Sequence, residues 1–125
     1  MITEDYVSFE IAKLLKEKGF DCLCHSYFRK DNPNNLVKET CGTNWNDTPF
    51  FTSRPTLQMA MKWFREVHNI FIEISVSIDL NGNYHYHYSV LDKECKYVRK
   101  GHTDFDWDYE EAAEAAIKYC LENLI

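Results

Sequence analysis

Side chains able to bind a metal or act in catalysis fall into two groups in this sequence. His85 and His87 alternate along one segment, and Glu73 lies in the apolar segment before it. Alternate residues of a β-strand share a face, so the two imidazoles could chelate a metal with Glu73 as a third ligand. A solvated sheet face, or a face covered by a partner, explains the same pattern. We therefore expect no bound metal and keep His85 and His87 as the metal candidates on this face.

The second group is rich in cysteine and consists of Cys22, Cys24, His25 and Cys41. A single residue separates the first two cysteines, whereas structural zinc sites usually place roughly two to four residues between cysteine ligands. No second close pair follows, and five cysteines at irregular spacing do not form the pattern of a disulfide framework. The sequence predicts free thiols, with Cys22, Cys24 and Cys41 as less favoured metal candidates.

Motifs for nucleotide binding and for hydrolysis are absent from the sequence. The chain has four glycines and no phosphate-binding glycine loop. It also contains neither a Gly-x-Ser-x-Gly elbow nor a His-Glu-x-x-His helix. We therefore assign no catalytic residue and no cofactor. A non-enzymatic role in protein binding is favoured, and a small metal- or thiol-dependent enzyme is the alternative.

The composition is that of a folded, acidic protein. The 125 residues are 45% hydrophobic and 15% aromatic, which predicts a single domain with a hydrophobic core. A net charge of -6 disfavours nucleic acid as a partner, because an acidic surface repels phosphates. The sequence shows neither a long apolar run nor the pattern of a signal peptide. We expect a cytoplasmic protein that does not contact a membrane.

Three segments have the apolar spacing of helices. The first begins near Ser8 and ends at Gly19. The second begins at Pro55 and ends at Asn69, and its predicted buried stripe is Leu57, Ala60, Met61, Phe64 and Val67. The third begins at Asp108, which forms a capping-box pattern with Glu111. Its stripe is Ala113, Ala116, Ile117, Cys120 and Leu124.

Between the second and third helices the apolar residues change to a period of two. The runs from Ile70 to Leu80 and from Tyr84 to Val90 flank an Asn-Gly pair, which predicts a hairpin. A loop from Leu80 to Gly82, with Gly82 in the left-handed conformation, places all the bulky residues on one face. The predicted opposed pairs are Ile78 with Tyr84, Val76 with Tyr86 and Ile74 with Tyr88.

A third strand near Cys95 to Val98 is predicted after a turn at Asp92, with Cys95 and Tyr97 facing inward. The predicted fold is an α+β two-layer sandwich, in which an antiparallel meander of about three strands packs against three helices. A fourth strand is possible near residues 25–29. Residues 21–54 otherwise read as an irregular loop, pinned by Trp45, Phe50 and Phe51.

The second face of the predicted hairpin is polar and ends in an apolar pair. Its members are Phe71, Glu73, Ser75, His85, His87 and Leu91. An open antiparallel sheet can expose a polar face to water, but the Phe71 and Leu91 pair is less suited to full exposure. We therefore predict this face as the surface for a protein partner or for self-association.

Three segments carry a resemblance: Tyr6 to Asp21 (YVSFEIAKLLKEKGFD), Arg54 to Ile74 (RPTLQMAMKWFREVHNIFIEI) and Tyr109 to Ile125 (YEEAAEAAIKYCLENLI). Together they resemble a family of small uncharacterised proteins of gut anaerobic bacteria and their phages and prophages. The members of this family have a similar first segment, a second segment with a Pro-Thr helix start and a Trp, and a similar last segment. Residues 21–54 of this chain differ from the corresponding part of those proteins. The resemblance implies origin in a mobile element and a cytoplasmic setting in a host bacterium. It implies no activity and no catalytic residues.

Overall fold

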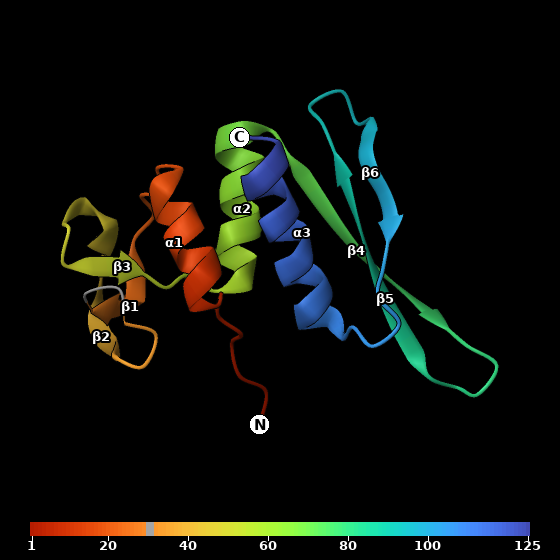
Figure 1. Ribbon diagram of the computed structural model, residues 1–125, viewed down its shortest axis with the longest axis horizontal. Coiled ribbons are helices and arrows are strands. Elements are labelled where there is room, and N and C mark those ends of the chain that lie inside the picture. Colours follow the sequence, from red (N-terminus) through yellow and green to blue (C-terminus); the bar gives the residue numbers. More distant parts are fainter. Residues whose placement is uncertain (30–31) are drawn as a thin grey trace. The chain divides into compact units, whose positions relative to one another are not determined.

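The computed structural model describes residues 1–29 and 32–125, and across them the chain has an α+β fold with three α-helices and two three-stranded antiparallel sheets (Figure 1). The predicted α+β class is therefore confirmed. The chain divides into two units, residues 1–60 with Ile125 and residues 61–124, and each is described by itself. That the whole chain is a single domain stays a prediction.

The first unit contains a sheet that sequence patterning did not identify. Its elements are α1 (Phe9–Glu17), β1 (Cys24–Arg29), β2 (Leu36–Thr43), the short 3-10 helix η1 (Trp45–Asp47) and β3 (Phe51–Ser53), with the strand order β2-β1-β3. The prediction of an irregular loop over residues 21–54 is wrong, because this span contains β1, β2 and β3, the three strands of this sheet. The possible strand at 25–29 is confirmed as β1, but it pairs with β2 and β3 rather than with the meander.

Local signals at both ends of α1 act as predicted. The Ser8 hydroxyl accepts a hydrogen bond from the Ile11 amide at 3.3 Å, and Gly19 has a φ of 87°. Trp45 pins its segment to the sheet, because its indole donates to the Cys24 carbonyl at 2.7 Å and its ring stacks on Tyr27 with centroids 4.1 Å apart. Phe50 does not share this role, since it is 59% exposed.

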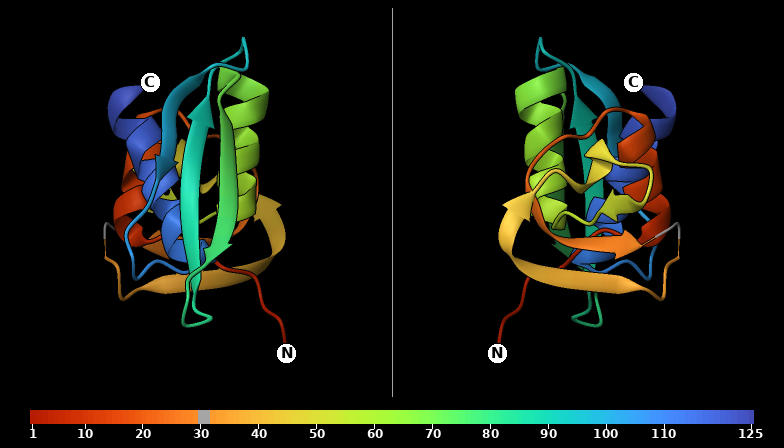
Figure 2. Two further views of the ribbon diagram at one scale, coloured as in Figure 1. Left: turned by 90° about the vertical axis from the view of Figure 1, so that its right-hand side faces the viewer. Right: turned by 90° about the vertical axis from the view of Figure 1, so that its left-hand side faces the viewer.

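The second unit contains the predicted meander. It comprises most of α2 (Leu57–His68), then β4 (Phe71–Ile78), β5 (Tyr84–Leu91), β6 (Tyr97–His102) and α3 (Tyr109–Asn123). The strand order is β4-β5-β6, so β5 lies in the middle (Figure 2). α3 packs against β4 and β5. No helix in the described part of the chain combines the length and the apolar character needed to cross a membrane.

The helix ends of α2 and α3 follow their sequence signals with small differences. α2 begins at Leu57 rather than at Pro55, because the Thr56 hydroxyl accepts from the Met59 amide at 3.1 Å and so caps the helix. Asn69 ends it with a φ of 54°, as predicted. α3 has the predicted capping box between Asp108 and Glu111. The fully buried side chains of α3 are Ala112, Ala113, Ala116, Ile117, Cys120 and Leu121.

One member of the predicted α2 stripe is misplaced. Val67 is 56% exposed, whereas Trp63, which is outside the predicted stripe, is 3% exposed. The buried face is therefore rotated toward Trp63. The larger indole removes more apolar surface from water than the valine would, which favours this rotation.

The predicted hairpin register is confirmed at every pair. Ile78 lies opposite Tyr84, and the pairing continues without a shift to Phe71 opposite Leu91. Gly82 has a φ of 83°, and the Asp79 amide donates to the Asn83 carbonyl at 2.9 Å, which closes the loop of Leu80 to Gly82. Only glycine adopts this conformation without strain, so a single residue type sets the loop length and with it the register.

The predicted orientation of the third strand is wrong. Cys95 lies in the turn before β6 with a φ of 60° and is exposed. Tyr97 lies opposite Leu91, on the polar face, and is 49% exposed. A bulge between the Val90 and Leu91 pairings shifts the register of β6. As a result Arg99 reaches α3, with its guanidinium 4.7 Å from the centre of the Tyr119 ring.

Candidate functional site

The six residues predicted as a binding face share one face of the meander. β4 and β5 place Ser75 opposite His87, and the apolar pair Phe71 and Leu91 at the far end. Glu73 and Ser75 are exposed, while the other four are partly exposed. We call this set, Phe71, Glu73, Ser75, His85, His87 and Leu91, the polar face. Its geometry agrees with the prediction, but its role in binding stays a prediction.

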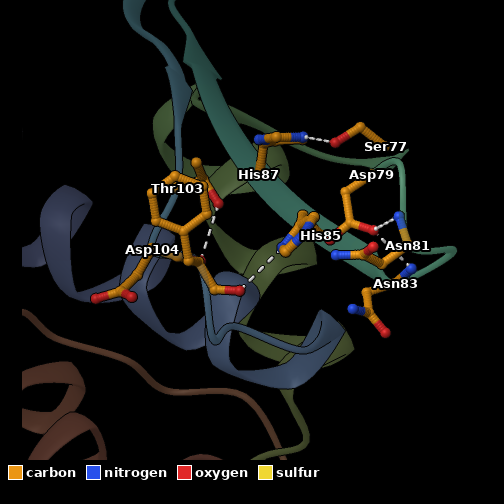
Figure 3. Close-up of polar contacts among 9 residues, drawn as sticks. Ser77, Asp79, Asn81, Asn83, His85, His87, Thr103 and Asp104 are labelled. Carbon is orange, nitrogen blue, oxygen red and sulfur yellow. Dashed lines mark hydrogen bonds and ion pairs between the residues drawn. The ribbon is translucent and has the colours of Figure 1, made fainter.

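His85 links the hairpin turn to the linker before α3 (Figure 3). Its Nε2 lies 2.8 Å from the Asp79 carboxylate, and its Nδ1 lies 2.9 Å from the Phe105 carbonyl. Both partners are acceptors, so only the doubly protonated imidazolium donates to both. The hydrogen bond to Asp79, and then that to Phe105, raise the pKa of His85. Because both ring nitrogens already have partners, His85 is not a free general base.

Asp79 organises the turn while it binds His85. Its Oδ1 accepts from the amides of Asn81 and Asn83 at 2.8 and 2.9 Å, and its Oδ2 faces His85. The hydrogen bond with His85 contributes most to lowering the pKa of Asp79 to about 2, followed by the amide of Asn83. The sequence pattern did not identify Asp79 as the partner of His85.

The two pKa shifts give the His85–Asp79 pair a defined pH window. His85 has a raised pKa, so its contribution to stability is complete below its ordinary value of 6.5 and is lost as pH rises through the folded-state pKa. Asp79 has a lowered pKa, so its contribution is present above its ordinary value of 3.8 and is lost as pH falls through about 2. The pair therefore stabilises the turn most between pH 3.8 and 6.5.

We predict that Asp79→Asn lowers the pKa of His85, because the amide cannot supply the negative charge that favours the imidazolium. The measurement is an NMR titration of the His85 ring Cε1–H signal. Asp92→Asn is the matched control, since Asp92 caps the β5–β6 turn through the amides of Glu94 and Lys96 without contacting a histidine. An unchanged His85 pKa in Asp79→Asn would contradict the assigned pairing.

The structure does not bring the candidate metal ligands together. The Nε2 of His87 lies 2.8 Å from the Ser77 hydroxyl, and both ring nitrogens of His85 have other partners. The Glu73 carboxylate accepts from the Tyr97 hydroxyl at 3.2 Å. In residues 1–29 and 32–125, no three histidine, cysteine, aspartate or glutamate side chains are placed to hold a metal ion.

The cysteines are dispersed, and none forms a disulfide. Cys24 is buried in β1, where its thiol donates to the Cys22 carbonyl at 3.6 Å, while Cys41 is exposed on β2. Burial raises the pKa of Cys24 to about 12. The Cys24 thiol therefore stays protonated and is a poor nucleophile at neutral pH.

The opposite face of the hairpin carries an apolar surface that we did not predict to be exposed. Val76 is 55% exposed, Ile78 61% and Tyr84 66%, and Leu80 in the turn is fully exposed. We call these four residues the hairpin-tip patch. α3 begins at Tyr109, whose ring contacts that of Tyr86, so α3 does not extend over the strand residues nearer the turn. The strand pattern identified which face of the hairpin is apolar, but it did not show where the helix that covers this face begins.

Fold and site together define an α+β protein whose meander sheet is covered by α3 over only part of one face. No family model, no curated protein and no solved structure matches this chain.

Proposed function

We propose that this chain is a non-enzymatic accessory protein of a phage or other mobile element, and that it acts by binding another protein through the meander. The hairpin-tip patch is the observation that carries the proposal. Isolated exposed apolar side chains are ordinary, but neighbouring ones on one sheet face are typical of protein interaction surfaces. Val76 and Tyr84 lie on adjacent strands of that face, two residues apart in register.

The geometry favours the hairpin-tip patch over the polar face as the principal contact. Phe71 and Leu91 are only partly exposed, so a partner would remove less apolar surface from water there than at Ile78 and Tyr84. Tyr97 lies opposite Leu91, and its hydroxyl donates a hydrogen bond to Glu73. The Phe71 and Leu91 pair is therefore bordered by a polar contact within the sheet. The polar face therefore serves as the second candidate surface, for a partner or a second copy.

The proposed origin rests on the three sequence segments that resemble proteins of gut bacteria, their phages and prophages. A cytoplasmic setting in the host follows from the same resemblance. The net charge of -6 supports a protein partner rather than nucleic acid.

The proposed contact predicts that Val76→Ser with Ile78→Ser weakens partner binding while the protein stays folded. Each substitution removes an exposed apolar contact worth on the order of 1 kcal/mol, so the pair should weaken binding by roughly tenfold or more. The measurement is a pull-down from host cells with the purified chain, followed by titration of the captured protein. Val67→Ser is the matched control, because Val67 is 56% exposed on α2, almost the same as Val76 on β4.

The double variant Phe71→Ser with Leu91→Ser separates the two surfaces. A loss of capture, or of self-association in sedimentation, that is confined to this variant would move the contact to the polar face. Equal capture by wild type and by both double variants would contradict binding through the meander.

A further inference from the structure

The first unit contains a pocket whose lining residues all belong to that unit. Its volume is about 110 Å³, and its walls are mainly apolar. It is formed beside the residues that precede α2, with Tyr6, Leu23, Cys24, Pro55 and Met59 contributing apolar surface. Arg54 lies in the same wall. A guanidinium beside an apolar pocket combines a hydrophobic volume with a fixed positive charge.

Arg54 is held in place by neighbouring side chains of the first unit. Its guanidinium stacks at 4.1 Å from the centre of the Tyr6 ring and donates to the buried Ser26 hydroxyl at 3.2 Å. Partial burial lowers the pKa of Arg54. No carboxylate in the described ranges forms an ion pair with it. A partly desolvated cation of this kind gains most from a carboxylate, which it can bind through two parallel hydrogen bonds.

The surroundings of the pocket also favour a negative charge. The described residues that line the pocket include His25 and no acidic residue. The Lys38 ammonium lies 5.4 Å from the centre of the Tyr6 ring, the ring that also carries Arg54. Thr56, which caps the positive end of the α2 dipole, completes the wall. The Cys24 thiol is protonated at neutral pH and adds no negative charge.

We propose that this pocket binds a small aliphatic monocarboxylate, with the carboxylate on Arg54 and the hydrocarbon chain between Leu23 and Met59. The volume sets the size of the chain. An apolar cavity of about 150 Å³ accommodates benzene, so the smaller pocket here suits a chain of about four carbons beyond the carboxylate. A ligand this small binds weakly, with a dissociation constant on the order of 1 mM.

Isovalerate is the probe for the test, and two-dimensional amide NMR at pH 7 is the measurement. Isovalerate should shift the amide signals of Leu23, Cys24 and Thr56 in a saturable way. Isovaleramide, which has the same chain without the charge, should bind at least tenfold more weakly. Acetate, which has the charge with almost no chain, should also bind at least tenfold more weakly. Equal binding of either analogue would overturn the proposal.

Arg54→Met should weaken isovalerate binding at least tenfold, because it keeps the length of the side chain and removes the charge. Arg65→Met is the matched control, since Arg65 is exposed on α2 and does not line the pocket, and it should leave binding unchanged. If Arg54→Met perturbs the fold in the same spectra, Arg54→Lys replaces it. Lysine keeps the charge but not the two-pronged geometry, so it should still weaken binding severalfold. Unchanged binding in a folded Arg54 variant would refute the site.

Discussion

Phe64→Ala should lower the free energy of unfolding by about 3–5 kcal/mol, the usual cost of removing a buried aromatic ring. Phe64 has no exposed surface, and its ring packs against those of Trp63 and His68, with centroids 5.2 and 6.3 Å away. The truncation loses the transfer free energy of the ring and leaves a cavity that closely packed neighbours fill only partly. Because small domains are stable by only about 5–15 kcal/mol, this one change removes a large part of the total.

Urea unfolding followed by tryptophan fluorescence measures the effect of Phe64→Ala. Val67→Ala is the control in the same helix, since Val67 has the helical spacing of a buried residue but is 56% exposed. It should change the free energy of unfolding by no more than about 0.5 kcal/mol. Similar losses in both variants would show that the buried face of α2 includes Val67 after all.

Lys16→Met should destabilise the first unit by about 2 kcal/mol, although Lys16 reads from sequence as an ordinary cation near a helix end. Its ammonium donates to two backbone carbonyls, that of Thr48 at 2.7 Å and that of Phe51 at 2.6 Å. These charge-assisted hydrogen bonds attach α1 to the segment from Thr48 to Phe51, the first residue of β3. Methionine keeps the hydrocarbon stem but leaves both carbonyls without this donor.

Amide hydrogen exchange at Thr52 and Ser53 locates the effect of Lys16→Met, and urea unfolding gives its size. Faster exchange is expected in β3, because its first residue, Phe51, and the preceding Thr48 lose their attachment to α1. Lys62→Met is the control, because Lys62 is exposed on α2 and makes no hydrogen bond or ion pair with another described residue. Unchanged exchange in β3 would contradict this role for Lys16.

The two candidate surfaces and the pocket depend on different residues. The hairpin-tip patch and the polar face both depend on the β4–β5 register, while the pocket depends on Arg54 and Tyr6 in the first unit. Variants of Val76 and Ile78 should therefore leave carboxylate binding intact, and variants of Arg54 should leave partner capture intact.

Features governed by neighbouring residues were predictable from the sequence. Ser8, Gly19 and the Asp108–Glu111 capping box set helix ends through hydrogen bonds within a few residues. Gly82 determined the length of the hairpin loop. Because the apolar residues alternate strictly, only one register then places all the bulky side chains on the same face. All six residues of the polar face followed from that register.

Features that depend on partners distant in the chain were decided only by the tertiary structure. The strands β1, β2 and β3 lack a period of two, because β1 buries consecutive residues from Ser26 to Phe28 whereas β2 is mostly exposed. Their pairing joins segments that are separated in the chain. The bulge in β6 turned Tyr97 outward and Arg99 toward α3. The partner of His85 at Phe105 lies 20 residues away. Finally, the strand pattern states which face is apolar but not how far α3 extends over it, so the exposure of Val76 and Ile78 followed from where that helix begins.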